Sequence, residues 1–272
     1  MCINGKELDE IYQRQYAGGF EEGRLTYSKA NETEFILTMH YIHKFIKEGA
    51  RVIDIGAGCG AYTKDISEEG YFVDTIDLHE DNVSRMRELF KDSENVNVYQ
   101  GNALDLHEFT DDSYDLVLLM GPVYHLHKFE DRVAAIKEAA RVAKKGAPIF
   151  VAFVLQDAPL IEYIFQSENP AEEINEIGYI RETAQVTENT GSSIFLHTIA
   201  TIDDLTDKVC ASLSVTKGPR FAQDGLSQVI REAVNNMSEA SYNEWIQYLI
   251  ATAERPDLMG YSNHVVQTFI NN

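Results

Sequence analysis

The chain has 272 residues, of which 44% are hydrophobic and 25% are charged, a composition typical of a globular protein with one large α/β domain. Acidic residues outnumber basic residues by 44 to 23, and the formal net charge of −21 disfavours nucleic acid and anionic membrane surfaces as partners. The three cysteines have no paired spacing, which predicts neither a disulfide framework nor a metal site. The polar N-terminus and the lack of an apolar run of roughly 20 residues favour a soluble, cytoplasmic protein.

The first 50 residues are predicted to form a helical cap, because apolar side chains recur at helical spacing between Glu32 and Lys47. Strands and helices alternate from Arg51 onward. Strands that are separated by helices favour a doubly wound α/β fold with a mostly parallel sheet. The predicted strands are 51–55, 71–77, 96–100, 116–120 and 149–155, and the predicted helices between them are 61–69, 80–90 and 129–143.

The alternation of strands and helices breaks after Leu155. Two insertions, at about 156–200 and 219–260, are interpreted as helical lids, because structureless loops of that length are uncommon. Together with the alternating part of the chain they would form one domain over residues 51–272.

Helix-capping residues are predicted in the second half of the chain. Thr201 is expected to cap a helix that ends near Ala211, and Ser241-x-x-Glu244 is expected to open a later helix as a capping box. Further strands are predicted at 213–216 and 264–270.

A glycine-rich segment lies where the first strand turns into the first helix: Asp54-Ile55-Gly56-Ala57-Gly58-Cys59-Gly60. A ligand crevice is expected there in a doubly wound sheet, since glycines let the backbone approach a ligand and the helix N-terminus offers free N–H groups. Gly56-x-Gly58-x-x-Ala61 also satisfies the dinucleotide fingerprint. Asp54 favours a ligand with an ammonium group instead, because a carboxylate has no evident use beside a pyrophosphate.

The pattern Asp-x-Gly-x-Gly-x-Gly after a β-branched strand resembles motif I of the class I S-adenosylmethionine-dependent methyltransferases. The resemblance implies a seven-stranded, Rossmann-like, mostly parallel sheet whose last strand is antiparallel. It also implies that the loop wraps the methionine end of the cofactor S-adenosylmethionine and that the acid lies close to the cofactor's amino group. The positions that match this motif are Asp54, Gly56, Ala57, Gly58 and Gly60.

Asp77 ends the second predicted strand, 21 residues after Gly56, where a carboxylate can accept two hydrogen bonds from a ribose diol. Dinucleotide enzymes use the same arrangement, so Asp77 indicates a nucleoside without choosing between the two cofactors. The resemblance places Leu78 beside the adenine and assigns adenine contacts to Asn102 and Ala103, which follow the third strand. Taken alone, Asn102 is slightly better explained as a turn residue, and only its context favours a contact with the adenine.

The fourth strand ends in Met120, and Gly121-Pro122-Val123-Tyr124-His125-Leu126 follows it. A strand that ends in G-P-x-Y-H-L resembles a subgroup of these methyltransferases that acts on small molecules. The resemblance places the Met120 carbonyl and Gly121 beside the sulfonium. His125 is a candidate base because histidine titrates near neutral pH, and Tyr124 is a second candidate for chemistry. Both side chains are equally well explained as packing at the floor of the pocket.

These observations predict a methyltransferase that moves a methyl group from S-adenosylmethionine to a small-molecule acceptor by in-line displacement. Two alternatives stay open: an NAD(P)-dependent oxidoreductase on the same fold class, and a non-catalytic S-adenosylmethionine-binding protein. The identity of the acceptor and the oligomeric state are not indicated. The N-terminal aromatic residues are expected either to close over the cofactor or to pack in the core; they are Tyr12, Tyr16, Phe20 and Tyr27.

Overall fold

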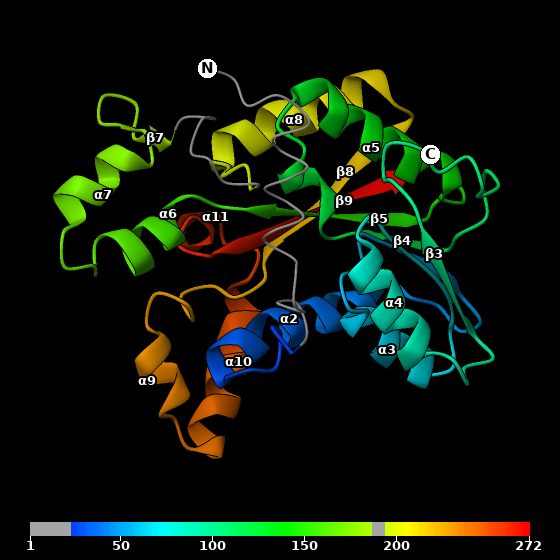
Figure 1. The fold of residues 1–272 in the computed structure, drawn as a ribbon, viewed down its shortest axis with the longest axis horizontal. Coiled ribbons are helices and arrows are strands. Elements are labelled where there is room, and N and C mark those ends of the chain that lie inside the picture. Colours follow the sequence, from blue (N-terminus) through cyan, green and yellow to red (C-terminus); the bar gives the residue numbers. More distant parts are fainter. Residues whose placement is uncertain (1–22, 187–193) are drawn as a thin grey trace.

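The computed structural model describes residues 23–186 and 194–272 of the chain. A seven-stranded sheet crosses the middle of the molecule, with helices on both of its faces (Figure 1). Strand β9 runs antiparallel to both of its neighbours, and the other adjacent pairs are parallel. This arrangement confirms the predicted doubly wound, mostly parallel fold. The strand order is β3-β2-β1-β4-β5-β9-β8, with β1 (Arg51–Ile55), β2 (Phe72–Asp77), β3 (Val96–Gln100), β4 (Leu116–Leu119), β5 (Pro148–Val154), β8 (Val215–Ala222) and β9 (His264–Asn271).

The parallel strands β1 to β5 begin and end within one residue of their predicted bounds. Strands β4 and β5 are buried along their whole length, as strands covered on both faces must be. Successive side chains alternate between the two faces, so that Ile53 and Val117 enter one apolar core while Val52 and Leu118 enter the other. The short apolar runs of the sequence therefore specify the strands, and their alternation divides the core into two layers.

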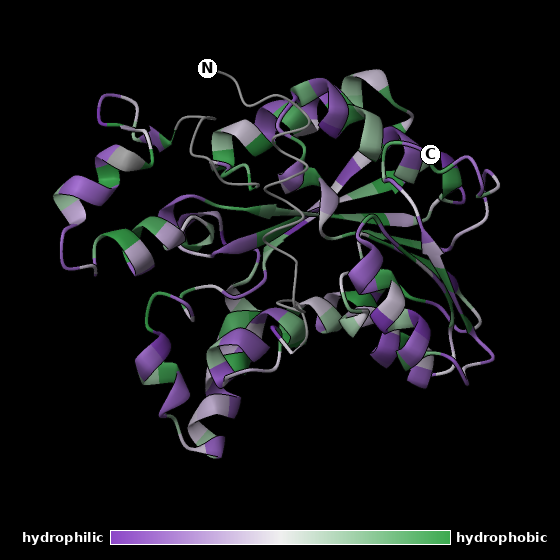
Figure 2. Ribbon diagram, viewed as in Figure 1, coloured by the Kyte–Doolittle hydropathy of each residue, from purple (hydrophilic) through white to green (hydrophobic). Residues whose placement is uncertain are grey.

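Helices cover both faces of the sheet, and Figure 2 shows apolar residues concentrated along the central strands, with mixed residues on the helices. That mixture is expected for helices with one buried side. One face is covered by α5 (Phe129–Val142) and α8 (Ile199–Ser212), and the other by α2 (Lys29–Phe45), α3 (Ala61–Glu68), α4 (Glu80–Leu89) and α10 (Glu239–Thr252) (Figure 1).

Short elements interrupt the alternation at both predicted insertions. Helix α2 packs against the helices of the second insertion, where the Tyr242 hydroxyl of α10 donates a hydrogen bond to the Lys29 carbonyl at 2.8 Å. Helix α2, which belongs to the cap predicted at 1–50, therefore shares one layer with the second insertion, while the domain boundaries stay predictions. The first group contains α6 (Asp157–Pro159), η2 (Leu160–Ile164), α7 (Pro170–Glu176), β6 (Tyr179–Ile180) and β7 (Gln185–Val186), and the second contains α9 (Arg231–Asn235), α10 and α11 (Pro256–Met259).

Two predicted helix starts are wrong by three residues. The N-cap of α8 is Thr198, and Thr201 is the third helical residue, whose hydroxyl accepts a hydrogen bond from the Thr198 N–H at 2.9 Å. The N-cap of α10 is Ser238, whose hydroxyl accepts from the Ser241 N–H at 3.2 Å. In each case the sequence contains two hydroxyl residues three positions apart. The upstream residue caps the helix, and the downstream residue is the third residue of the helix, whose N–H donates to the capping hydroxyl.

The strand predicted at 213–216 is wrong in length, because β8 continues to Ala222. The strand passes Gly218 and Pro219 through a register shift between Lys217 and Arg220. A bulge of this kind tolerates glycine and proline in a strand near a sheet edge. Residues 219–222, which the prediction assigned to the second insertion, belong to this strand.

No helix in the ranges 23–186 and 194–272 combines the length and the apolar composition that crossing a membrane requires. Of the N-terminal aromatic residues, Tyr12, Tyr16 and Phe20 lie outside the described residues. Tyr27 is 90% exposed, so the expectation that it packs in the core is wrong.

Candidate cofactor and acceptor site

The strand order reverses between β1 and β4, which lie side by side at the centre of the sheet. Strand β1 continues to β2 on one side, and β4 continues to β5 on the other. In sheets of this kind ligands bind in the crevice beyond the carboxyl ends of the strands at such a switch point. The glycine-rich loop 56–60 and the turn η1 (Pro122–His125) both start there.

Two of the predicted glycines hold these two loops against each other. Gly56 has a φ of +74°, and a Cβ atom there would lie 2.4 Å from Cδ of Pro122. A Cβ atom on Gly121 would lie 2.8 Å from the carbonyl oxygen of Gly56. Only glycine permits this backbone contact, so both residues build the floor of the crevice.

The remaining positions of the loop lead into α3. Gly58 and Gly60 have φ values of 58° and 81°, in the left-handed region that glycine adopts at little cost. Gly60 is the N-cap of α3 and offers no side-chain hydrogen bond to the free N–H groups of the first turn. Ala57 is partly buried against the cluster of Met86, Phe90 and Val96. The N–H groups of Gly56 and Ala57 donate to the Ile76 carbonyl at 2.8 and 3.2 Å, so the loop is held against the end of β2 and leads directly into the N-terminus of α3.

Asp54 is completely buried at the end of β1. Its Oδ2 accepts a hydrogen bond from the Thr63 hydroxyl at 2.8 Å, whereas its Oδ1 is buried without a hydrogen-bond partner. Burial raises the pKa of Asp54 to about 7, against the Thr63 hydrogen bonds that lower it. A buried carboxylate oxygen without a donor fits a cationic group of a ligand, since that contact would offset the cost of burial.

Asp77 reaches from the end of β2 to the glycine-rich loop. Its Oδ2 accepts from the Gly58 N–H at 2.9 Å, and its Oδ1 accepts from the His79 N–H at 2.8 Å and from Asn82 Nδ2 at 3.1 Å. Burial raises the pKa of Asp77, although these three hydrogen bonds act in the opposite direction. The neighbouring Leu78 is 45% exposed, which leaves an apolar side chain at the crevice.

The segment after β3 lies at the same edge of the sheet, because the Gly101 N–H donates to the Asp77 carbonyl at 3.0 Å. Asn102 is exposed, and its Oδ1 accepts from the Leu104 N–H at 2.9 Å. That contact is the turn role that the sequence left open for this residue. Ala103 is 8% exposed and belongs to the apolar core.

Tyr124 and His125 lie in η1, directly after β4. Their rings are 4.8 Å apart and both residues are half-buried. The Tyr124 carbonyl accepts a hydrogen bond from the Phe195 N–H at 2.6 Å, which ties this turn to the first insertion. Met120, just before the turn, is 8% exposed. The structure thus brings every predicted site residue to the carboxyl edge of the sheet, near the switch point.

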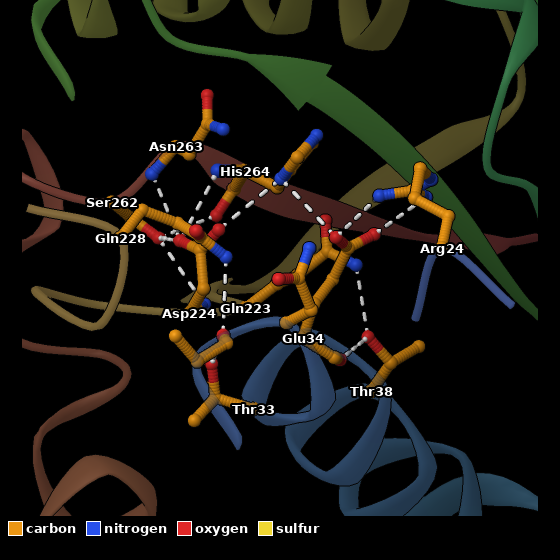
Figure 3. Close-up of polar contacts among 12 residues, drawn as sticks. Arg24, Thr33, Glu34, Thr38, Gln223, Asp224, Gln228, Ser262, Asn263 and His264 are labelled. Atoms are coloured by element: carbon orange, nitrogen blue, oxygen red, sulfur yellow. Dashed lines mark hydrogen bonds and ion pairs between the residues drawn. The ribbon is translucent and has the colours of Figure 1, made fainter. Parts of the chain in front are cut away.

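A buried polar cluster that the sequence did not predict lies at the same edge, among α2, β8 and β9 (Figure 3). His264 Nδ1 is 3.4 Å from Glu34 Oε2 and 3.2 Å from Asp224 Oδ2. Arg24 donates to both carboxylate oxygens of Glu34, at 2.8 and 3.1 Å. Within the described ranges, the ligand atoms of Glu34, Asp224 and His264 lie within 4.8 Å of one another, a geometry that could also hold a metal ion. No sequence spacing signals this group, because its members are far apart in the chain.

Comparison of sequences supports a methyltransferase domain in the part of the chain that carries the crevice. Residues 53–151 match the model of a family described as a methyltransferase domain. No curated protein matches the chain. The matched range contains the glycine-rich loop, Asp77, the segment after β3 and the turn after β4.

Solved structures share the fold at low sequence identity. A methyltransferase from Methanosarcina mazei, described as S-adenosylmethionine-dependent, has a TM-score of 0.55 at 15% identity, covering 85% of this chain and 96% of that one. A protein in a complex with the Trm112 methyltransferase activator of Haloferax volcanii has a TM-score of 0.58 at 16% identity, covering 95% and 96%. An S-adenosylmethionine-dependent methyltransferase from Thermotoga maritima has a TM-score of 0.57 at 16% identity, covering 97% and 99%. Residues 53–151 therefore match a methyltransferase-domain family, and the chain shares the Rossmann-like fold of these solved methyltransferases. Together these similarities imply S-adenosylmethionine as the cofactor.

Proposed function

We propose that this protein transfers the methyl group of S-adenosylmethionine to a small-molecule acceptor. The observation that carries this proposal is the buried, unpartnered Oδ1 of Asp54 beside the glycine-rich loop. The amino group of the methionine end of the cofactor supplies the cation that this oxygen lacks. A dinucleotide would bring a pyrophosphate to the same place, where a carboxylate would repel it.

The cofactor roles follow the order of the strands along the crevice. The glycine-rich loop wraps the methionine end, Asp77 binds the ribose, and the segments after β2 and β3 flank the adenine. The Met120 carbonyl and Gly121 border the sulfonium. The proposed cofactor-binding residues are Asp54, Gly56, Ala57, Gly58, Gly60, Asp77, Leu78, Asn102, Ala103, Met120 and Gly121.

The Asp77 carboxylate can still accept a hydrogen bond from the ribose. Its Oδ2 accepts one hydrogen bond, from the Gly58 N–H, whereas its Oδ1 accepts two. A carboxylate oxygen has about two acceptor positions, so Oδ2 can accept a ribose hydroxyl as well. The same carboxylate would then join the glycine-rich loop to the sugar.

The acceptor is proposed to lie beyond Gly121, bordered by Tyr124 and His125. Residues 121–126 form the G-P-x-Y-H-L pattern of a small-molecule subgroup, and the net charge of −21 supports a small or cationic acceptor over a polyanion. A cytoplasmic location, expected from the cysteine usage, belongs to the same proposal. His125 is the base that the sequence suggests.

The chemistry is an in-line displacement in which an acceptor atom attacks the methyl carbon opposite the departing sulfur. The sulfonium supplies a good leaving group, so the chain's own contribution is alignment and the exclusion of water. Orientation alone contributes roughly 7–11 kcal/mol in favourable cases. That contribution explains why a methyltransferase needs no array of catalytic side chains at the crevice.

Isothermal titration calorimetry of the purified protein with S-adenosylhomocysteine tests the proposal, with NADH as the parallel ligand. We expect micromolar binding of S-adenosylhomocysteine and none of NADH, and Asp77→Ala should weaken binding at least about tenfold because the ribose contacts are lost. Binding of NADH alone would identify an oxidoreductase instead. Unchanged affinity in Asp77→Ala would remove Asp77 from the site.

A second measurement separates an enzyme from a non-catalytic binding protein. Transfer of a tritiated methyl group from S-adenosylmethionine is followed with a panel of primary amines, secondary amines and phenols. Transfer to any member supports the enzyme. Binding of S-adenosylhomocysteine without transfer to any member would favour a binding protein that has lost the chemistry.

A further inference from the structure

His264 lies at the acceptor side of the proposed methyl donor. It is the first residue of β9 and pairs with Val154 at the carboxyl end of β5. Because β5 lies beside β4, His264 is two strand spacings, or about 10 Å, from the line of β4. A small acceptor that is attacked at the end of β4 would fill that interval.

The sheet register carries His264 to the height of the crevice loops. Asp54, Leu118 and Phe150 form one row across β1, β4 and β5. Val154, the partner of His264, is four residues beyond Phe150, which is about 13 Å toward the carboxyl edge. Four residues beyond Asp54 and Leu118, the other two members of the row, the chain has reached the glycine-rich loop and the start of η1.

His264 also faces the side of the sheet that carries α2. Along β9, Val266 packs in the same apolar core as Val52, Leu118 and helix α2. Side chains two residues apart in a strand point to the same face, so His264 shares the face of Val266. Glu34, which contacts His264, comes from α2 and confirms this orientation. Asp54, two residues after Val52, shares the same face by the same rule.

Two carboxylates hold the His264 imidazole at its Nδ1 atom. Asp224 Oδ2 and Glu34 Oε2 both face Nδ1, at 3.2 and 3.4 Å. The other oxygen of Asp224 accepts from the Ser262 hydroxyl and from the N–H groups of Asn263 at 2.8 Å and His264 at 3.3 Å. These contacts keep a proton on Nδ1, and Nε2 points away from both carboxylates (Figure 3).

The charged groups around His264 come from five segments of the chain. Glu34 lies on α2, Asp224 follows β8, and Arg24 precedes α2 and pairs with Glu34. From η2, Glu162 interacts with His264 and Asp224 and pairs with Arg231 at 2.6 Å. Burial acts to lower the pKa of His264, but the Glu34 and Asp224 carboxylates outweigh burial and hold the pKa above its ordinary value.

We propose that His264, clamped at Nδ1 by Asp224 and Glu34, uses Nε2 to take the proton from the atom of the acceptor that is methylated. This inference rests on the proposed methyltransferase function. The acceptor is then an amine or hydroxyl compound that still carries a proton on its attacking atom. Asp224 and Glu34 are positioning residues, which orient the ring and stabilise the imidazolium that forms.

The step balances in atoms and charge. A lone pair on the acceptor atom forms the new bond to the methyl carbon, and the carbon–sulfur bond breaks with its electron pair on sulfur. S-adenosylmethionine thereby becomes neutral S-adenosylhomocysteine. The proton of the acceptor atom passes to Nε2 of His264 and then to water.

A metal ion at Glu34, Asp224 and His264 is the competing interpretation of the same atoms. The contacts disfavour it, because Arg24 occupies both oxygens of Glu34 and places a positive charge beside the position of the ion. Asp224 is likewise saturated at one oxygen by hydrogen-bond donors. Titration of the full-length protein with Zn²⁺ tests this interpretation.

The test uses nuclear magnetic resonance of the full-length protein with ¹⁵N-labelled histidines, titrated with pH in complexes with S-adenosylhomocysteine and with sinefungin. Sinefungin carries an ammonium group at the position of the transferred methyl group, whereas S-adenosylhomocysteine is uncharged there. We expect the His264 pKa to be about one unit lower in the sinefungin complex, because a cation then lies near the ring. Asp224→Asn and Glu34→Gln should each lower the His264 pKa without ligand, and His264→Gln assigns the resonance.

His43, which pairs with Glu69 at 2.9 Å, is the internal control. It lies near the C-terminal end of α2, ahead of β1 and so toward the opposite edge of the sheet, and its resonance should be the same in both complexes. For any acceptor that the wild type methylates, His264→Gln should lower kcat by at least about 100-fold.

Equal His264 pKa values in the two complexes would overturn the proposal, as would full turnover in His264→Gln. Binding of one Zn²⁺ that is lost in Asp224→Asn would overturn it in favour of a metal site. If neither cofactor analogue binds, the methyltransferase function fails and the inference fails with it. If both bind and only the His264 response is missing, the inference alone fails.

Discussion

At the scale of the residue, Asp54 combines a structural cost with a proposed function. It is completely buried, one of its oxygens has no partner, and its pKa is raised to about 7. An ordinary aspartate has a pKa near 4, so the unfolded chain ionises this group before the folded protein does. The ligand-free protein therefore loses stability as the pH rises from about 4 to about 7, and the loss persists above that range. Such a cost is typical of a site prepared for a charged ligand.

Asp54→Asn should stabilise the ligand-free protein at pH 8 and weaken its binding of S-adenosylhomocysteine. The expected gain is roughly 2–4 kcal/mol in the free energy of unfolding, because the ionised carboxylate is no longer buried. Denaturant unfolding at pH 5 and pH 8 measures the gain, which should be much smaller at pH 5. A variant that is less stable than the wild type at pH 8 would contradict the assignment.

The same carboxylate makes cofactor affinity depend on pH in the wild type. The ammonium group of the ligand favours the ionised form of Asp54, so affinity should rise with pH up to about 7 and then level off. Calorimetric titrations with S-adenosylhomocysteine between pH 5.5 and pH 8.5 measure this profile. In Asp54→Asn the profile should be flat over this range.

At the scale of the element, the crevice depends on contact between the loop after β1 and the turn after β4. Gly56→Ala should separate them, because the new Cβ atom would lie 2.4 Å from Cδ of Pro122. Gly49→Ala is the matched control, since Gly49 has a nearly equal φ of +73° and no atom within 4 Å of the added Cβ. Both variants carry the backbone strain of about 1–2 kcal/mol, and only Gly56→Ala adds the clash, of roughly 1–3 kcal/mol.

Chemical denaturation and binding of S-adenosylhomocysteine distinguish the two variants. Gly49→Ala should keep the wild-type affinity, whereas Gly56→Ala should lose at least about tenfold. Equal affinities would show that the contact with Pro122 does not shape the binding site.

Helix α8 offers a second test at this scale. Thr198→Ala should cost about 1 kcal/mol of stability, because the Thr198 hydroxyl accepts the Thr201 N–H as the N-cap. Thr201→Ala should cost less, since the Thr198 N–H that it leaves unpaired lies in a part-buried position at the helix end. Thermal or urea unfolding of both variants gives the comparison. A larger loss in Thr201→Ala would restore Thr201 as the residue that caps the helix.

Local patterns in the sequence predict helices α3, α4 and α5 within one residue, but they fail where two residues can each cap a helix. The bounds of strands β1 to β5 agree with the prediction within one residue, and β1 and β3 each end directly before a glycine. The start of α8 was misplaced because Thr198 and Thr201 are both good N-cap residues, and the choice depends on where the chain enters the helix. The same ambiguity between Ser238 and Ser241 displaced the start of α10.

At the scale of the whole molecule, the two apolar layers stabilise the fold while the surface carries a large negative charge. The net charge of −21 makes the compact state repel itself, and salt screens that repulsion. Raising NaCl from about 10 mM to about 150 mM should therefore raise the Tm by roughly 2–5 °C. Differential scanning calorimetry measures the change, and choline chloride should have the same effect if the cause is screening. A Tm that falls or does not move would show that surface repulsion is unimportant.

The sequence alone determined the parts of this protein that depend on neighbouring residues. The alternating apolar runs, the glycines of the loop 56–60 and the acid at Asp54 are local features of the sequence. They predicted the parallel strands, which the structure confirms, and they underlie the proposed cofactor crevice. Only the tertiary structure decided where distant segments meet. Strand β9 inserts between β5 and β8, and α2 packs across the same edge, which brings Glu34, Asp224 and His264 together. Those contacts arise from packing between elements far apart in the chain, and no periodicity within one segment records them.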